Sequence, residues 1–276
     1  MEGFSGKVAV VTGAGSGIGR ALAVELARSG AKIAISDIDN EGLSETERQI
    51  KSLGGDVRSV RLNVAEREAF LLYADAIKEH FGTVNQIYNN AGIDFHGELE
   101  ASEFKDIERI IDVDFWGVVN GTKAFLPHLI ASGDGHVVNV SSIFGVMACP
   151  GQSSYNAAKF AVRGFTESLR QEMIIGKKPV AVTCVHPGGI KTNVARNATV
   201  AEGYDHAEFT KLFDMLARTR PQAAARIILT AVRKKKPRVL VGPDAKAIDI
   251  LVRLTGARYQ DLFVLGERFL MPKRSH

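Results

Sequence analysis

Cysteine, long apolar runs and metal-ligand patterns are all scarce in this 276-residue sequence. Its two cysteines, Cys149 and Cys184, fit no disulfide framework, so we expect the protein to belong to a reducing compartment. Its seven histidines show no metal-ligand spacing, and we expect no bound metal. No run of about 18 apolar residues could span a membrane, and the N-terminus lacks the basic and apolar stretches of a signal peptide. Together these absences predict a cytoplasmic protein.

Positive charge is concentrated near the C-terminus. Residues 218–276 hold 14 lysine and arginine residues against four acidic ones, whereas the rest of the chain carries more acidic than basic residues. The run Arg233–Lys236 has no interleaved aromatic residues and belongs to no recognised nucleic-acid module, so we expect no nucleic-acid partner. Because cations stabilise a helix C-terminus, this run is predicted to be a solvated helix end.

Short apolar segments rich in β-branched residues alternate with helical patterns. The predicted strands are Val8–Thr12, Lys32–Ser36, Val57–Leu62, Val84–Tyr88, Gly135–Val140, Val180–Val185 and Arg238–Val241. The predicted helices are Gly17–Ser29, Glu41–Leu53, Glu66–Phe81, Ser102–Ala131, Ser153–Ile175 and Pro221–Lys234. Such alternation is typical of βαβ units, and strands that are apolar at nearly every position fit a sheet buried on both faces. We therefore predict an α/β fold, a doubly wound Rossmann-type parallel sheet of about seven strands with helices on both faces.

Two segments do not fit this alternation. Residues 193–220 contain two short helical patterns and are longer than an ordinary connection, so we predict that they cover a binding site. Residues 243–276 are apolar with scattered arginines and are predicted to be a C-terminal helical extension. The main domain then spans residues 1–242, with the extension packed on it.

The turn after the first predicted strand has the features of a dinucleotide-binding loop. Its spacing is Thr-Gly-x-x-x-Gly-Ile-Gly, and a helical pattern follows at once. Glycines at such a turn let the backbone approach a pyrophosphate at a helix N-terminus, and a plain tight turn is the weaker alternative. The loop residues expected to contact the cofactor are Gly13, Ser16, Gly17, Ile18 and Gly19.

An acidic residue, Asp37, follows the second strand 18 residues after Gly19. A carboxylate at this place accepts hydrogen bonds from the adenosine ribose and repels a 2′-phosphate. No basic residue follows Asp37 directly, so NAD is predicted as the cofactor in preference to NADP.

Three side chains form a possible catalytic group. Ser142 lies after the fifth strand, 13 residues before Tyr155, and Tyr155 shares a helix face with Lys159 at spacing i,i+4. A phenol titrates at a pH of about 10, and a neighbouring ammonium lowers its pKa. Tyr155 is therefore suited to exchange a proton with an alcohol or carbonyl while a hydride moves to or from the cofactor, with Ser142 holding the substrate oxygen.

Together with Asn89-Asn90-Ala91-Gly92 and Pro187-Gly188, these motifs resemble the classical short-chain dehydrogenase/reductase family over roughly residues 5–242. The resemblance implies that Ser142 polarises the substrate oxygen, Tyr155 is the general acid/base and Lys159 also binds the nicotinamide ribose. The contacts to the cofactor that it implies are Asn90, Ala91, Gly92, Tyr155, Lys159, Pro187, Gly188, Ile190 and Thr192. It also implies a homotetramer or homodimer assembled through residues 102–131 and 153–175.

Two positions depart from the family pattern. Asp114 takes the place of the usual asparagine before the fifth strand, and it adds a negative charge near Lys159. We keep Asp114 in the predicted catalytic set because it can still shape the local helix backbone. Asn63-Val64 replaces the usual Asp-Val pair, and both residues are retained as expected contacts to adenine.

The predicted substrate pocket is largely apolar. The residues expected to line it are Phe95, Phe144, Val146 and Met147, together with the cover, whose charged residues are Arg196, Asp205 and Arg218. A hydrophobic alcohol or carbonyl compound is therefore the expected substrate, with a polar group at one end left open. His96 either lines this pocket or caps a loop.

The C-terminal extension has two interpretations. Its apolar stretch Ile248–Leu254 is accompanied by Arg253, Arg258, Arg268 and Lys273, a combination that can lie on an anionic membrane. Packing against the protein, where it would close the substrate site, is the favoured interpretation. For the whole chain, the expected function is that of an NAD-dependent oxidoreductase acting on a hydrophobic alcohol and its aldehyde or ketone. An NAD-binding sensor or scaffold without turnover is the alternative, and only Asp114 suggests it.

Overall fold

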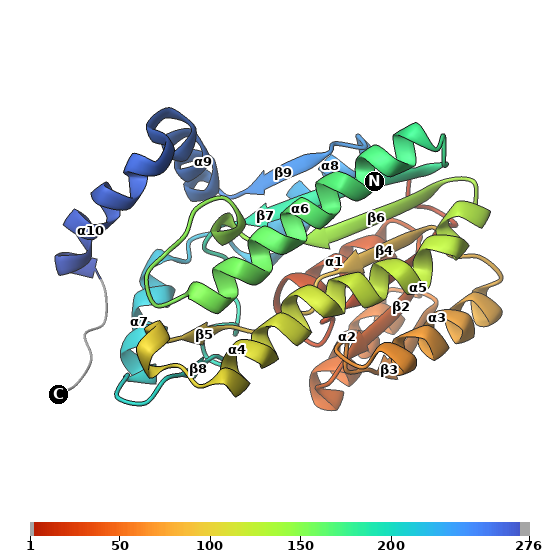
Figure 1. The fold of residues 1–276 in the computed structure, drawn as a ribbon. Coiled ribbons are helices and arrows are strands. Elements are labelled where there is room, and N and C mark those ends of the chain that lie inside the picture. The colour runs from red at the N-terminus through yellow and green to blue at the C-terminus, as the bar shows by residue number, and fades with distance from the viewer. Residues whose placement is uncertain (1–2, 271–276) are drawn as a thin grey trace.

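Seven parallel strands form one sheet in the order β3-β2-β1-β4-β6-β7-β9 (Figure 1). They come from a computed structural model that describes residues 3–270, with side chains as far as residue 265. The strands are β1 Val8–Thr12, β2 Lys32–Asp37, β3 Val57–Arg61, β4 Gln86–Asn89, β6 Gly135–Val140, β7 Val180–Pro187 and β9 Arg238–Val241. The helices are α1 Gly17–Arg28, α2 Asn40–Ser52, α3 Arg67–Phe81, α4 Phe104–Ile111, α5 Gly117–Ala131, α6 Ser153–Ile175, α7 His206–Leu216, α8 Pro221–Arg233, α9 Pro243–Thr255 and α10 Tyr259–Leu270. The predicted doubly wound α/β fold is confirmed.

Both faces of the sheet are covered because successive strand residues point to opposite sides. In β1, Val8 and Val10 pack in the apolar cluster that contains residues of α3, α5 and α6, while Ala9 and Val11 pack in the cluster of α1, α2 and α8. All residues of β1 are buried. The apolar character of nearly every strand position therefore follows from a helix layer on each side.

The order of the strands reverses between β1 and β4. From β1 the chain adds β2 and β3 on one side, and β4, β6, β7 and β9 follow on the other side. In an open parallel sheet, ligands bind outside the carboxyl ends of the strands at such a reversal. The predicted functional residues follow the carboxyl ends of β1, β2, β4, β6 and β7. The topology thus brings segments that are distant in the sequence to one edge of the sheet.

One prediction of secondary structure was wrong in its detail. The single helix expected over Ser102–Ala131 is divided into α4, a π-helical turn over Asp112–Trp116, and α5. A π-helical turn holds one residue more than an α-helical turn, so it shifts the side chains that follow around the helix axis. Here it places Asp114 inside the protein, fully buried. In addition, β4 begins at Gln86 instead of Val84.

The two segments outside the alternation form further structure near the same edge. The cover contains α7 and the strand β8 (Thr199–Val200), which pairs with the unpredicted strand β5 (Phe95–His96). The C-terminal extension forms α9 and α10, which project from the sheet edge beyond β9 (Figure 1). Among residues 3–270, no helix combines the length and the apolar character that crossing a bilayer requires.

The core on the α3 and α5 side depends on three aromatic rings. Phe125 of α5 meets Phe70 and Tyr73 of α3 edge to face, with ring centroids 6.3 and 5.9 Å away. We expect Phe125→Ala to lower the free energy of unfolding by about 3–5 kcal/mol, because it leaves a cavity among closely packed side chains. Urea unfolding measures this change. Leu72→Ala, at an exposed position of α3, is the control, and an equal loss in both variants would contradict the importance of the ring cluster.

Candidate active site

A single cavity of about 1330 Å³ opens along the carboxyl ends of the strands. This volume exceeds the roughly 300–1,000 Å³ typical of a pocket for one small molecule, so the cavity has room for two ligands side by side. Most of the residues predicted to bind a cofactor or to act in catalysis line it. Gly19 lies just outside, packed against the loop.

The glycine loop between β1 and α1 fits a nicotinamide dinucleotide, because side chains are excluded where the backbone must approach a ligand. Gly13 has a positive φ of 63°, and a Cβ atom there would lie 2.7 Å from the Cα atom of Ala91. Gly17 also has a positive φ, of 52°, and a Cβ atom there would lie 3.0 Å from Cγ2 of Thr192. The bare backbone at the start of α1 is what a pyrophosphate requires.

Thr12 joins the carboxyl ends of β1 and β4. Its hydroxyl accepts hydrogen bonds from the backbone N–H groups of Asn90 and Ala91, both at 3.0 Å. The side-chain amide of Asn90 in turn donates to the Thr12 carbonyl at 3.0 Å. Thr12 was not predicted as a site residue, although its place directly before Gly13 was a signal for it.

Asp37 lies at the end of β2, as predicted, and its carboxylate faces the glycine loop. It accepts hydrogen bonds from the backbone N–H groups of Gly15, at 2.7 Å, and Asp39, at 3.0 Å. The nearby guanidinium of Arg20 donates to the carbonyls of Gly15 and Gly42. Arg20 is therefore already bound to the backbone, whereas Arg61, at the end of β3, lines the cavity beside Asp37.

Asn63 and Val64 line the cavity beyond Asp37. The Asn63 side chain accepts a hydrogen bond from the backbone N–H of Ala65 and donates one to Glu66, both within the turn that precedes α3. Val64 is held by Asn120, whose side-chain amide donates to its carbonyl at 3.0 Å. The Asn-Val pair is therefore fixed in position at the wall of the cavity.

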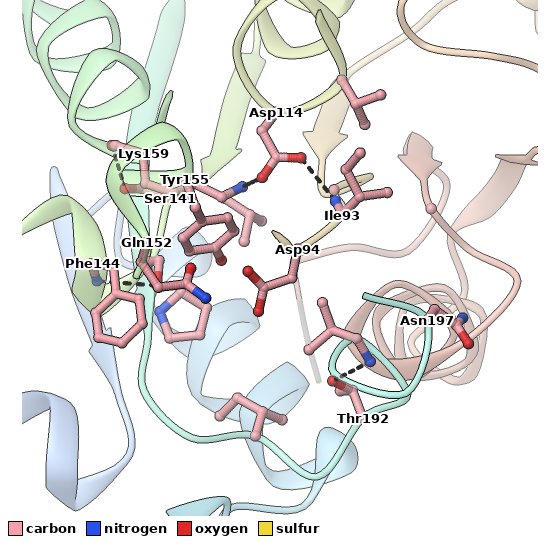
Figure 2. A pocket seen from close by; sticks show the side chains of 18 of the residues that line it. Ile93, Asp94, Asp114, Ser141, Phe144, Gln152, Tyr155, Lys159, Thr192 and Asn197 are labelled. Atoms are coloured by element: carbon pink, nitrogen blue, oxygen red, sulfur yellow. Dashed lines mark hydrogen bonds and ion pairs between the residues drawn. The ribbon is translucent and has the colours of Figure 1, made fainter. Parts of the chain in front are cut away.

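The structure brings the four predicted catalytic residues together (Figure 2). Tyr155 and Lys159 project from the first turns of α6, and the Lys159 ammonium lies 5.4 Å from the centre of the Tyr155 ring. Ser142, at the end of β6, forms a hydrogen bond with the Tyr155 hydroxyl. Lys159 Nζ lies 3.0 Å from Oδ2 of Asp114, whose Oδ1 accepts a hydrogen bond from the backbone N–H of Ile93 at 2.8 Å.

The pKa of Tyr155 differs from the sequence-based expectation. Burial raises it well above the ordinary value, and the negative charges of Asp94 and Asp114 raise it further, whereas the hydrogen bond with Ser142 lowers it. Lys159, which is paired with Asp114, is not among the groups that lower the pKa of Tyr155 in the protein alone. Burial likewise raises the pKa of Asp114, which Lys159 opposes.

Asp94 is a buried carboxyl group that the sequence did not identify as functional. It lies two residues after Gly92 and accepts a hydrogen bond from the backbone N–H of Phe95 at 2.8 Å. A second hydrogen bond joins it to the side chain of Gln152. Burial raises the pKa of Asp94 to about 7, with a further contribution from the negative charge of Asp114.

Asp244 also escaped the sequence analysis. It belongs to the first turn of α9, in the C-terminal extension, and its carboxylate accepts a hydrogen bond from the Gly189 N–H at 2.6 Å. A Cβ atom on Gly188 or on Gly242 would collide with this carboxylate. Asp244 therefore supports the loop after β7 that carries Ile190 and Thr192.

The apolar part of the cavity differs from the expected lining. Phe144 and Met147 line it, but Phe95 and Val146 are buried in neighbouring clusters, since the chain turns them away from the cavity. Much of the remaining apolar lining comes from the cover and the C-terminal helices, including Leu212, Phe213, Leu216, Ile248, Leu251, Tyr259, Leu262 and Phe263.

The polar residues expected at this wall also need correction. The charged residues predicted in the cover, Arg196, Asp205 and Arg218, are not part of the lining, and Arg196 is paired with Asp214 at the surface. His96 does line the cavity, stacked on Phe209 with ring centroids 4.8 Å apart. Arg268 and Lys273 lie outside the side chains that the structure describes.

The buried carboxyl of Asp94 makes stability depend on pH. Because its pKa is raised, the folded state holds a proton more tightly than the unfolded state, so this residue costs stability as the pH rises from about 4 to 7. We expect the free energy of unfolding of Asp94→Asn, relative to that of the unmodified protein, to be about 2–3 kcal/mol higher at pH 8 than at pH 5. Urea unfolding at the two pH values measures this gain. Asp56→Asn, at an exposed carboxyl whose partner is a lysine, should show no such gain, and a constant difference for Asp94→Asn would contradict the raised pKa.

Comparison with known proteins agrees with this geometry. The family model for short chain dehydrogenases matches residues 7–203. The chain is 63% identical over 273 residues, 99% of each protein, to the oxidoreductase SadH of Mycobacterium tuberculosis. It is 35% identical over 228 residues to a cyclohexanol dehydrogenase of Acinetobacter sp., covering 82% of this chain and 87% of that protein.

A solved structure extends the likeness to the whole fold. A short-chain dehydrogenase/reductase of Burkholderia phymatum in complex with NAD superimposes with a TM-score of 0.86 at 28% identity, covering 100% of this chain and 99% of that one. The expected resemblance is thereby confirmed, and the chain belongs to the short-chain dehydrogenase/reductase family of oxidoreductases, which use a nicotinamide cofactor.

Proposed function

We propose that this oxidoreductase interconverts a hydrophobic alcohol and its aldehyde or ketone with NAD. The observation that carries the proposal is the position of Ser142, Tyr155 and Lys159 in the same cavity as the glycine loop. One part of that cavity suits a dinucleotide and the other is apolar. The reacting carbon of a substrate would lie between them, beside Tyr155.

The mechanism follows from these side chains. A bound nicotinamide would supply the hydride acceptor for alcohol oxidation and, in its reduced form, the hydride donor for carbonyl reduction. The Ser142 hydroxyl holds the substrate oxygen, and Tyr155 removes the proton of the alcohol as its carbon is oxidised. In the opposite direction Tyr155 donates that proton to the carbonyl oxygen. Lys159, held by Asp114, binds the nicotinamide ribose and keeps positive charge near the phenol oxygen.

Asp37 supports the choice of NAD over NADP. Its carboxylate would lie next to the adenosine ribose. It could accept hydrogen bonds from the two ribose hydroxyl groups of NAD, but it would repel the 2′-phosphate of NADP. Arg20 is bound to the backbone, so the preference rests on Asp37 outweighing the charge of Arg61, which lines the same part of the cavity. In this proposal Asn63 and Val64 contact adenine.

The remaining cofactor contacts also belong to the proposal. The residues between β4 and the loop after β7 that would contact the cofactor are Asn90, Ala91, Gly92, Pro187, Gly188, Ile190 and Thr192, all of which line the cavity. Among them, Ile190 and Thr192 would hold the nicotinamide carboxamide. Ser16, Gly17 and Ile18 would contact the pyrophosphate at the start of α1.

The C-terminal extension is proposed to close the substrate part of the cavity. Its wall includes Ile248, Leu251, Tyr259 and Leu262 of the extension. These contacts support packing of the extension on the domain of residues 1–242, and their apolar side chains favour an apolar substrate. Contact with an anionic membrane is the second candidate role, supported by the exposed Leu254 on the outer side of α9.

The assembly is proposed to be a homotetramer or homodimer. Large apolar side chains are exposed on the helices that the family resemblance assigned to contacts between subunits. These are Phe104, Trp116 and Phe160, on α4, the π-helical turn and α6. An apolar surface of this kind favours burial against a second copy.

The alternative function, NAD binding without turnover, rests on the pairing of Lys159 with Asp114. The decisive experiment measures NADH formation from NAD with a panel of hydrophobic primary and secondary alcohols. We expect Tyr155→Phe to lower kcat by about 10²–10⁴-fold, the usual contribution of a general acid or base. Tyr73→Phe, a buried tyrosine of α3 that does not line the cavity, is the matched control. Binding of NAD without oxidation of any alcohol would favour the sensor.

A second experiment tests the cofactor. We expect Asp37→Ser to weaken NAD and to remove the repulsion of NADP, so that the ratio of kcat/KM for NAD to that for NADP falls by about tenfold or more. Steady-state kinetics with both cofactors measure this ratio. Asp56→Ser, at an exposed position before β3, should leave it unchanged. An unaltered ratio in Asp37→Ser would show that Asp37 does not select the cofactor.

A further inference from the structure

Two buried polar side chains lie beside Tyr155 in the largely apolar part of the cavity, where His96 is a third polar group. Asp94 follows β4 and Gln152 directly precedes α6, and both line the cavity near Tyr155 (Figure 2). Asp94 is 8% exposed and Gln152 is 4% exposed. The proposed hydrophobic substrate does not explain why two such groups are buried here.

The hydrogen bonds of this pair leave acceptor atoms unused. The carboxylate of Asp94 accepts from the Phe95 N–H and from the Gln152 amide, which is two of roughly four acceptor sites. The Gln152 side chain donates to Asp94, and its Oε1 atom is buried without a hydrogen-bond partner among the described residues. A buried acceptor without a donor is unfavourable, so this part of the cavity is arranged to receive a donor.

A structural role alone does not account for the carboxyl group. Asparagine or serine could accept the same hydrogen bond from the Phe95 N–H without a buried charge. Burial of the Asp94 carboxyl is costly enough to raise its pKa to about 7. The carboxyl therefore provides something beyond the local turn, namely acceptor capacity directed at the substrate.

From this geometry, and on the basis of the proposed function, we infer that Asp94 and Gln152 bind a second hydroxyl group of the substrate. The substrate class is then an apolar diol or the corresponding hydroxy ketone. The second hydroxyl lies on the carbon next to the reacting one or on the carbon after that, because Tyr155 and the pair face the same space (Figure 2). This hydroxyl donates to the pair and is not itself oxidised.

A neutral donor fits this place better than an ammonium group. The oxidised nicotinamide carries a positive charge and would lie beside Tyr155 in the productive complex. The Lys159 ammonium is balanced by Asp114, 3.0 Å away, and the Asp94 carboxylate would balance the nicotinamide charge. An amino alcohol would bring a third positive charge into this buried space, whereas a hydroxyl donates a hydrogen bond without one.

The test uses substrates that share one ring. Cyclohexanol is compared with the cis and trans isomers of 1,2- and 1,3-cyclohexanediol and with trans-2-aminocyclohexanol, by NADH formation from NAD. A site built to bind a hydroxyl discriminates strongly against an analogue that lacks it. We expect at least one diol to exceed cyclohexanol in kcat/KM by about tenfold or more, and the amino alcohol to fall below that diol.

Variants then assign the preference to the pair. Asp94→Asn and Gln152→Met should each reduce the ratio of kcat/KM for the diol to that for cyclohexanol by about tenfold. Asp75→Asn, the same chemical change at an exposed site, should leave the ratio unaltered. Binding can be separated from turnover in the Tyr155→Phe protein with NAD, where the diol should bind more tightly than cyclohexanol.

Several results would overturn the inference. They are the absence of any preferred diol, a preference for the amino alcohol, and an equal loss for diol and cyclohexanol in both variants. If the unmodified protein oxidises cyclohexanol with no preference, the inference fails while the proposed function stands. If it forms no NADH from any of these alcohols or from the hydrophobic panel, the proposed function fails and this inference fails with it.

Discussion

The buried ion pair between Lys159 and Asp114 ties together the elements that form the active site. Asp114 comes from the π-helical turn, Lys159 from α6, and the second carboxylate oxygen of Asp114 holds the backbone that follows β4. Removing either partner would leave an uncompensated charge in the interior, which is strongly unfavourable. The relative positions of Tyr155, the loop after β4 and the sheet edge therefore depend on one contact of 3.0 Å.

The fold and the cofactor part of the site could be predicted because their signals are local. The glycine loop, Asp37 and the Tyr-x-x-x-Lys spacing each depend on a few neighbouring residues, and strand-helix alternation needs only patterns of apolar residues. The π-helical turn was missed because a helical pattern of side chains does not reveal one extra residue in a turn. Asp94 and Asp244 were missed because their partners are distant in sequence or belong to the backbone.

The substrate end was the least predictable part for the same physical reason. Val146 and Phe95 are apolar, as pocket residues would be, but in the fold their side chains are packed in apolar clusters next to the cavity. The cavity took its apolar wall from α7, α9 and α10 instead, which are remote in sequence from the catalytic residues. Only a few buried groups in that part of the cavity are polar. The hydrogen bonds that these groups can form determine which substrates the cavity can recognise.

Asp244 gives the C-terminal extension a second role besides its apolar wall. The same helix, α9, supports the Gly188-Gly189 loop through its first turn and faces the substrate through Ile248 and Leu251. A substrate that fixes the position of α9 would also fix the position of the loop that contacts the nicotinamide. By thermodynamic linkage the cofactor must then strengthen substrate binding by the same factor. The coupling between the two ligands would thereby be carried by one helix.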